Sequence, residues 1–200
     1  MAGEGSSAYP KTLHTGGTDI TFRLMTLHDR EAVLDFARAL PQHDLMFLRR
    51  DISEDAGIDA WLHELEIGEA TSVLAVDTDS TVVGYATVHR SLIPWSAHVA
   101  ELRVLVAEKM RGKGLGRLLT QEAFNLALSE GLEKMIAQMT LDQKGAISTF
   151  ESLGFRPEAL LRDHVKDRNG NRHDLLILSH EVQRFQAEHA SATSGSSPTP

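Results

Sequence analysis

The sequence predicts an α+β fold in which helices cover both faces of one central mixed sheet. Short runs of alternating or continuous apolar residues, typical of strands, are separated by segments with apolar residues at helical spacing. Their order is strand, two helices, three strands, helix, strand, helix and two strands, which favours one mixed sheet. With 200 residues, 42% of them hydrophobic, the chain suits a single domain of ordinary size.

The first half of the chain begins with a strand and a helix. Residues 20–24 alternate bulky and polar side chains, which predicts a strand. Apolar residues recur at helical spacing over 28–40, and Pro41 ends that helix. This half is also expected to contain a second helix at 58–67 and three strands at 71–76, 82–89 and 97–106.

The second half is expected to contain a longer helix and a C-terminal hairpin. Leucine and alanine form one stripe of a helix that begins near Gly114 and ends at Gly131, a typical left-handed cap. Asn169-Gly170 between two strand-like runs is the strongest hairpin signal of the chain. The other expected elements are a strand at 135–141, a helix at 145–153 and the two hairpin strands at 158–165 and 173–178.

Both ends of the chain are expected to be flexible tails. Residues 1–17 are rich in glycine and serine, and residues 184–200 end in serine, threonine, glycine and proline without apolar periodicity. The folded domain is therefore predicted to span 18–183.

Composition excludes several classes of function. Lys and Arg number 20 against 28 Asp and Glu, a net charge of −8, which disfavours nucleic acid as a partner. The absence of cysteine excludes disulfides, thiolate zinc sites and a cysteine nucleophile. No apolar run approaches the roughly 20 residues of a membrane span, so we expect no membrane partner and a cytoplasmic location. The ten histidines are scattered, and we expect no metal.

A glycine-rich run at 111–117, Arg-Gly-Lys-Gly-Leu-Gly-Arg, is the most informative motif. It lies where a strand-like stretch meets the helix that begins near Gly114. Glycines allow main-chain N–H groups to converge, the helix start adds partial positive charge, and three basic side chains add full charges, so a polyphosphate ligand is expected. The spacing fits neither the P-loop nor the dinucleotide-binding fingerprint.

The spacing Arg-x-x-Gly-x-Gly resembles the coenzyme A pyrophosphate loop of the GNAT superfamily of acyl-CoA N-acyltransferases. Residues 146–155, which end in Leu-Gly-Phe, are similar to the second signature of that superfamily. The order of the predicted elements also matches its fold. The resemblance implies a sheet that splays apart beside the glycine loop, with the coenzyme in the gap.

The resemblance implies acetyl-CoA as the donor substrate, held by the glycine loop, the preceding strand and the turn before the second signature. The main-chain N–H near Leu105 is expected to polarise the thioester carbonyl. The residues expected to bind the coenzyme are Val104, Leu105, Val106, Arg111, Gly112, Lys113, Gly114, Leu115, Gly116, Arg117 and Gln143.

Glu101 is the candidate catalytic residue. Attack by an amine requires its deprotonated form, and many members of the superfamily carry a carboxylate at the start of this strand. Gln138, where other members place the base, cannot accept a proton at neutral pH. A strand-end carboxylate paired with Arg103 or His98 is the structural alternative, and His98 is the reserve base.

Phe150 departs from the pattern, since the superfamily often has a tyrosine there to protonate the leaving sulfur. Two hypotheses follow: an N-acetyltransferase acting on a primary amine of a small molecule, amino acid or protein, and a coenzyme A-binding regulatory or sensory module without catalysis. We keep a homodimer open. The expected walls of the acceptor pocket, whose mixed charges suit a small zwitterion or a peptide end, are Gln42, His43, Asp44, Arg49, Arg50, His164, Arg172 and His173.

Overall fold

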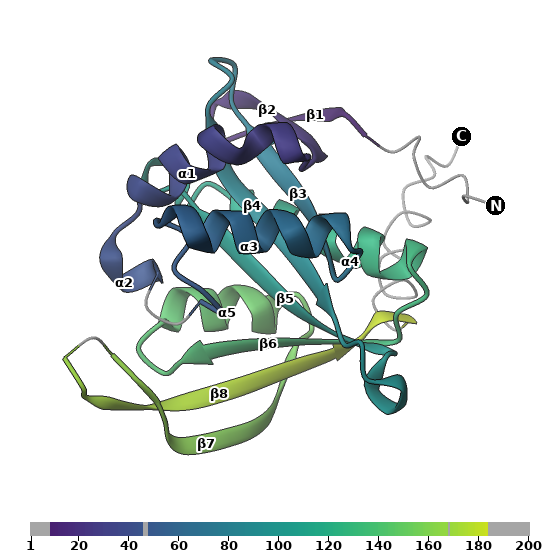
Figure 1. Ribbon diagram of the computed structural model, residues 1–200, viewed down its shortest axis with the longest axis vertical. Helices are drawn as coiled ribbons and strands as arrows, with labels where there is room; N and C mark the ends of the chain where they lie inside the picture. The colour runs from purple at the N-terminus through teal and green to yellow at the C-terminus, as the bar shows by residue number, and fades with distance from the viewer. Residues whose placement is uncertain (1–8, 46–47, 168, 184–200) are drawn as a thin grey trace, which may run out of the picture.

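The computed structural model describes residues 9–45, 48–167 and 169–183. In this part of the chain, eight strands form one sheet in the order β1-β2-β3-β4-β5-β6-β8-β7, and β5 and β6 are its parallel pair. Helices α1 and α3 cross one face of the sheet, and α4 lies behind it (Figure 1). The expected α+β fold, a mixed sheet with helices on both faces, is confirmed.

The predicted elements are all present, and none of their ends is more than three residues from its expected position. The strands are β1 (Lys11–Thr15), β2 (Thr18–Leu24), β3 (Ala70–Val76), β4 (Val82–Arg90), β5 (Val99–Val106), β6 (Lys134–Thr140), β7 (Arg156–Lys166) and β8 (Arg172–Glu181). The helices are α1 (Arg30–Arg38), α2 (Gln42–Leu45), α3 (Asp55–Glu66), α4 (Leu115–Ser129) and α5 (Lys144–Ser152), with 3-10 turns η2 (Leu27–Asp29), η3 (Pro94–Ser96) and η4 (Glu108–Met110).

The N-terminal segment differs from its prediction as a tail up to residue 17. Strand β1 pairs with β2 across Gly16 and Gly17, whose φ angles of 61° and 81° suit a two-residue hairpin turn. The Tyr9 hydroxyl donates to Glu122 Oε2 of α4 at 2.7 Å, and Lys11 Nζ lies 2.5 Å from Glu122 Oε1. Residues 9–17 therefore belong to the domain. The other expected tail, 184–200, and residues 1–8 lie outside the described residues.

The core has two layers, one on each side of the sheet. Strand β3 is buried on both faces because its side chains alternate between the layers. Val73 and Ala75 join the layer under α4 and α5, whereas Leu74 and Val76 join the layer under α1 and α3. This explains why the central strands read as nearly continuous apolar runs.

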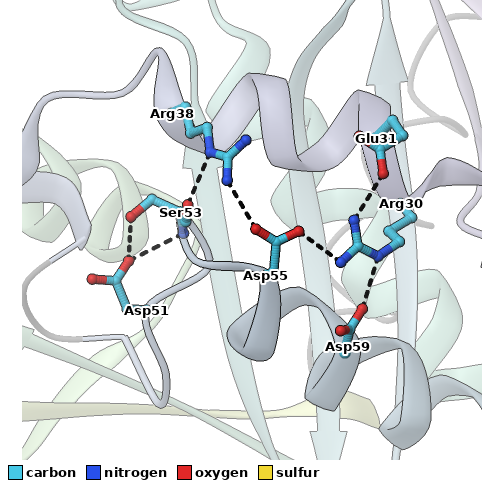
Figure 2. Close-up of polar contacts among 7 residues, drawn as sticks. All are labelled: Arg30, Glu31, Arg38, Asp51, Ser53, Asp55 and Asp59. Atoms are coloured by element: carbon cyan, nitrogen blue, oxygen red, sulfur yellow. Dashed lines mark hydrogen bonds and ion pairs between the residues drawn. The ribbon is translucent and has the colours of Figure 1, made fainter.

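Polar contacts fasten α1 to the start of α3 (Figure 2). Arg30 donates to Asp55 and Asp59 of α3, both at 2.8 Å. Arg38 donates to Asp55 and to the Ser53 carbonyl, both at 3.1 Å. Such exposed pairs contribute little individually. Together they hold the segment before α3, which carries residues 48–53, against α1.

The sheet opens between β5 and β6, as the resemblance implied. The two strands pair only over Val99–Glu101 and Lys134–Ile136, and they then diverge (Figure 1). Among the described residues, the last five positions of β5 have no pairing partner on β6. Main-chain groups on that edge of β5 are therefore available to a ligand.

Candidate functional site

A cleft of about 770 Å³ lies in the gap between the diverging strands. It is lined by β5, the loop after η4, the first turn of α4, the end of β6, the start of α5 and residues of α2. Most residues expected to bind a coenzyme line this one cleft: Val104, Leu105, Val106, Arg111, Gly112, Gly114, Gly116, Arg117 and Gln143.

The glycine loop has the backbone of an anion site. Gly112 and Gly114 adopt φ angles of 70° and 86°, a left-handed conformation that disfavours residues with a Cβ. Gly114 is the N-cap of α4, whose first turn contains no acidic residue. The first N–H groups of a helix have no partner within the helix. With Arg111 and Arg117 in the lining, this end of the cleft favours a negatively charged group.

Two residues of the predicted loop site lie outside the lining of the cleft. The stem of Lys113 lies against Gly16 of the β1–β2 turn, and its carbonyl accepts a hydrogen bond from Thr15 Oγ1 at 2.6 Å. Leu115 is completely buried in the core. Lys113 therefore fastens the loop to the N-terminal hairpin, and Leu115 packs in the core rather than in the cleft.

The direction of the β5 main chain changes the expectation for Leu105. Ala107 N–H donates to the Val83 carbonyl of β4 at 2.8 Å. Since N–H groups alternate in direction along a strand, that of Leu105 also points to β4. Val104 and Val106 thus present their main-chain groups to the gap, and an N–H donor to a thioester carbonyl is better placed there than at Leu105.

Glu101 lies where β5 and β6 begin to diverge, at the last paired position of β5. Its carboxylate forms an ion pair with Arg103 and lies 3.8 Å from Arg49 Nη1, and its side chain is 15% exposed. It does not line the cleft. Two guanidinium groups contact this carboxylate, so its position suits an ion-paired side chain better than a residue in contact with a substrate. The exposed His98 precedes β5, at the end away from the cleft.

The side chains near the second signature take up structural contacts. Phe150 lines the cleft and packs edge-on against Phe155, with ring centroids 4.9 Å apart. Its phenyl ring cannot donate a proton to a leaving group. Gln143 Oε1 accepts the Thr140 N–H at 3.1 Å, which closes the turn before α5. Of this side chain, the amide nitrogen remains to face a ligand.

The expected acceptor-pocket residues separate into three groups. His43 and Asp44 of α2 line the cleft, where His43 Nε2 lies 3.2 Å from Asp142 Oδ2 and Asp44 pairs with Arg111. Arg49 and Arg50 line a second, small cavity. The remaining expected residues line neither cavity: Gln42, His164, Arg172 and His173.

Sequence reasoning missed other residues of the two cavities. His89 of β4 pairs with Glu101 in the sheet register and lines the small cavity, with Nδ1 3.3 Å from Glu64 Oε2. Burial, more than the nearby Arg49, lowers the pKa of His89 to about 4. In sequence, His89 merely ends an apolar run. Lys144 and Thr149 of α5 also line the cleft, and only their proximity to Gln143 indicated this.

Two classes of feature are absent from the described ranges. No group of three or more His, Asp or Glu side chains there could hold a metal ion. No helix among these residues is long and apolar enough to cross a membrane.

The chain is similar to known acetyltransferases. The model of the acetyltransferase (GNAT) family matches residues 34–155. The curated "Putative phosphinothricin acetyltransferase YwnH" of Bacillus subtilis is 34% identical over 83 residues, which are 42% of this chain and 50% of that protein. The match thus spans about half the length of that relative.

Two solved structures illustrate the likeness of fold. One, described as a putative phosphinothricin N-acetyltransferase, has a TM-score of 0.69 and 25% identity, covering 82% of this chain and 98% of that chain. The other is spermidine N-acetyltransferase from Vibrio cholerae in complex with CoA and spermine. It has a TM-score of 0.70 and 15% identity, covering 84% of this chain and 98% of that chain, and this similarity concerns the fold alone.

Proposed function

We propose, from the premise that this chain belongs to the acetyltransferase (GNAT) family, that it transfers an acetyl group from acetyl-CoA to a primary amine. The observation that carries the proposal is the start of α4. A left-handed glycine caps a helix that has no acid in its first turn, and two arginines line the same end of a large cleft. This arrangement fits the pyrophosphate of a coenzyme.

The residues present fit acetyl-CoA along the rest of the cleft as well. The N–H groups at the start of α4, with Arg111 and Arg117, would hold the pyrophosphate. The open edge of β5 at Val104 and Val106 offers main-chain donors and acceptors to the amides of the pantetheine arm. Acetyl-CoA supplies the activated acyl group, and the chain binds and orients it.

The proposed reaction requires two proton transfers. The attacking amine must lose a proton, and Glu101, our sequence-based candidate, is held by two arginines. Water in the cleft is the alternative route. Phe150 has no proton for the departing sulfur, so we propose that the thiolate leaves with the help of water or unassisted.

Gly114→Val tests the phosphate site. A Cβ at φ 86° strains the backbone, a cost on the order of 1–3 kcal/mol. Gly114 lines the cleft, so relief of this strain would shift the loop that must meet the ligand. We expect calorimetry to show coenzyme A affinity lowered at least about tenfold, the equivalent of about 1.4 kcal/mol. Gly131→Val is the matched control, because Gly131 has φ 71° just beyond the other end of α4. Equal coenzyme affinity in both variants would exclude the assignment.

The amine transfer is tested by thiol release from acetyl-CoA with a panel of amino acids, peptides and polyamines. Thiol release with at least one amine would support the proposed acetyltransferase activity. The second candidate function, a coenzyme-binding sensory module, is favoured by Phe150 and by the ion-paired Glu101. Tight coenzyme A binding without thiol release for any amine would support that module and exclude the enzyme.

A further inference from the structure

A second cavity of about 20 Å³ lies beside the cleft, on the side of the sheet that α3 covers. Trp61 and Tyr85 form its apolar wall, with ring centroids 4.7 Å apart. Leu48 and Arg103 line both this cavity and the cleft. The two cavities are therefore neighbours.

Three guanidinium groups line the small cavity, and two of them have a buried donor without an acceptor among the described residues. Arg50 pairs with Glu64 through Nη2, but its Nη1 is buried without an acceptor among the described residues. Arg103 is engaged through its Nη atoms, whereas its Nε is likewise buried without an acceptor there. Arg49 is 45% exposed and pairs with Glu101 at 3.8 Å. Buried donors are usually paired, and an acceptor from outside the chain would satisfy these two.

The charges around the small cavity leave an excess of positive charge. The three arginines face two carboxylates, those of Glu64 and Glu101. His89, the other group of this cluster that titrates near neutrality, is uncharged at pH 7 because burial lowers its pKa to about 4. An anion with one charge would balance the cluster, and the planar fork of a guanidinium matches a carboxylate in particular.

We propose that the acceptor is an amine that also carries a carboxylate, as an amino acid does, and that this carboxylate binds to Arg49, Arg50 and Arg103 in the small cavity. The inference rests on the proposed function, because it assigns the acceptor of the same site. The carboxylate anchors the molecule where β5 leaves β6, and its amino group faces the cleft.

The same cluster disfavours two other classes of amine. A polyamine would bring further positive charge to three guanidinium groups, which repel it. A carboxamide has the shape of the acid but lacks its charge, so the positive charge of the cluster stays unbalanced. Selectivity for the acid over its own carboxamide is thus the direct consequence of this site.

The experiment compares L-amino acids with their α-carboxamides and with spermidine. Calorimetric titration of the coenzyme A-loaded protein measures binding, and thiol release from acetyl-CoA measures kcat/KM. We expect at least one amino acid to exceed its carboxamide at least tenfold in affinity, and spermidine not to bind. Binding is read without turnover, so a lack of thiol release would count against the proposed function alone.

The variant Arg49→Gln tests whether the small cavity causes the preference for the acid over its carboxamide. Arg49 is the most exposed of the three arginines, so this change is the one that the fold tolerates best. We expect the preference for the acid to fall at least fivefold while coenzyme A affinity stays constant. Arg156→Gln, an exposed charge on β7 outside both cavities, is the matched control and should keep the preference.

Three results would overturn the proposal. One is equal binding of the acid and its carboxamide, and another is an undiminished preference in Arg49→Gln. The third is that no amino acid of the panel binds at millimolar concentration.

Discussion

Glu101 shows how strongly a residue's role depends on its neighbours. Since Arg49 and Arg103 hold its carboxylate, we expect Glu101→Gln to lower kcat by less than about tenfold. A general base typically contributes about 10²- to 10⁴-fold. We also expect the acidic limb of the pH–rate profile to stay in place. Steady-state kinetics on the best amine checks this.

The opposite result for Glu101→Gln would restore the base that the sequence predicted. A fall in kcat of about 10²-fold, at unchanged coenzyme affinity and with the acidic limb removed, is the pattern of a lost proton acceptor. Glu108→Gln, an exposed carboxylate in η4, is a suitable control for the change of charge.

The glycine loop could be predicted because its parts are consecutive in the chain. Arg111, Gly112 and Gly114 carry the conformation and the charge of the site within a few residues, so local rules sufficed. The small cavity could not be predicted in the same way. Arg50 and His89 both contact Glu64 of α3, and no spacing in the sequence records those contacts.

Helix α2 is joined to the glycine loop by an ion pair between Asp44 and Arg111. A phosphate group at Arg111 must share that guanidinium with Asp44 or displace it. We expect Asp44→Asn to strengthen coenzyme A binding about two- to fivefold, in line with the 0.2–1 kcal/mol typical of an exposed ion pair. Calorimetry at low and at high salt measures it, and the gain should shrink as salt screens the pair.

Asp142→Asn separates this competition from a general effect of charge. Asp142 also lines the cleft and contacts α2, but its partner there is His43 rather than the loop arginine. Coenzyme affinity should change less in this variant than in Asp44→Asn. Equal gains in coenzyme A affinity in both variants would mean that negative charge near the cleft weakens binding in general, without a specific effect of the Asp44–Arg111 ion pair.

Element periodicity predicted the long helices and the buried strands, but it failed for two short elements. Helix α2 has four residues, too few for a helical period to appear. Strand β1 follows a segment rich in glycine and serine. The composition of Gly16-Gly17 predicts a flexible segment, whereas the two residues form a hairpin turn. The divergence of β5 from β6 depends on pairing between distant segments, which periodicity does not report.

Stability of the whole molecule should depend on pH through His89. Above the unfolded-state pKa of 6.5, neither state binds a proton there. Between pH 6.5 and about 4 the unfolded chain binds a proton at His89 that the folded protein does not bind. The free energy of unfolding therefore falls as the pH falls. The loss is on the order of 3 kcal/mol and is complete near pH 4. Urea denaturation at pH 7, 5.5 and 4.5 measures it.

His89→Gln is the control for this assignment, and it should flatten stability between pH 6.5 and 4. Carboxylates such as Asp167 affect the stability in a lower pH range than His89 does. Hydrogen bonds, chiefly from Asn171, lower the pKa of Asp167 to about 2, so the stability that this group contributes is lost only as the pH falls below about 4. An unchanged slope above pH 4 in His89→Gln would contradict the role of His89.

The contacts of Glu122 set the shortest chain that can fold well. This carboxylate in α4 is 3% exposed and is satisfied by Tyr9 and Lys11. A protein shortened to begin at Thr18 would leave it buried and unpaired, at a cost of about 3–5 kcal/mol and a melting temperature lower by about 10 °C. Glu122→Gln should then stabilise the shortened protein but destabilise the full chain. Thermal unfolding of the full and shortened proteins, each with and without Glu122→Gln, measures these changes in stability. Opposite signs in the two lengths would place the N-terminal boundary of the domain at or before residue 9. The same sign in both lengths would refute that boundary.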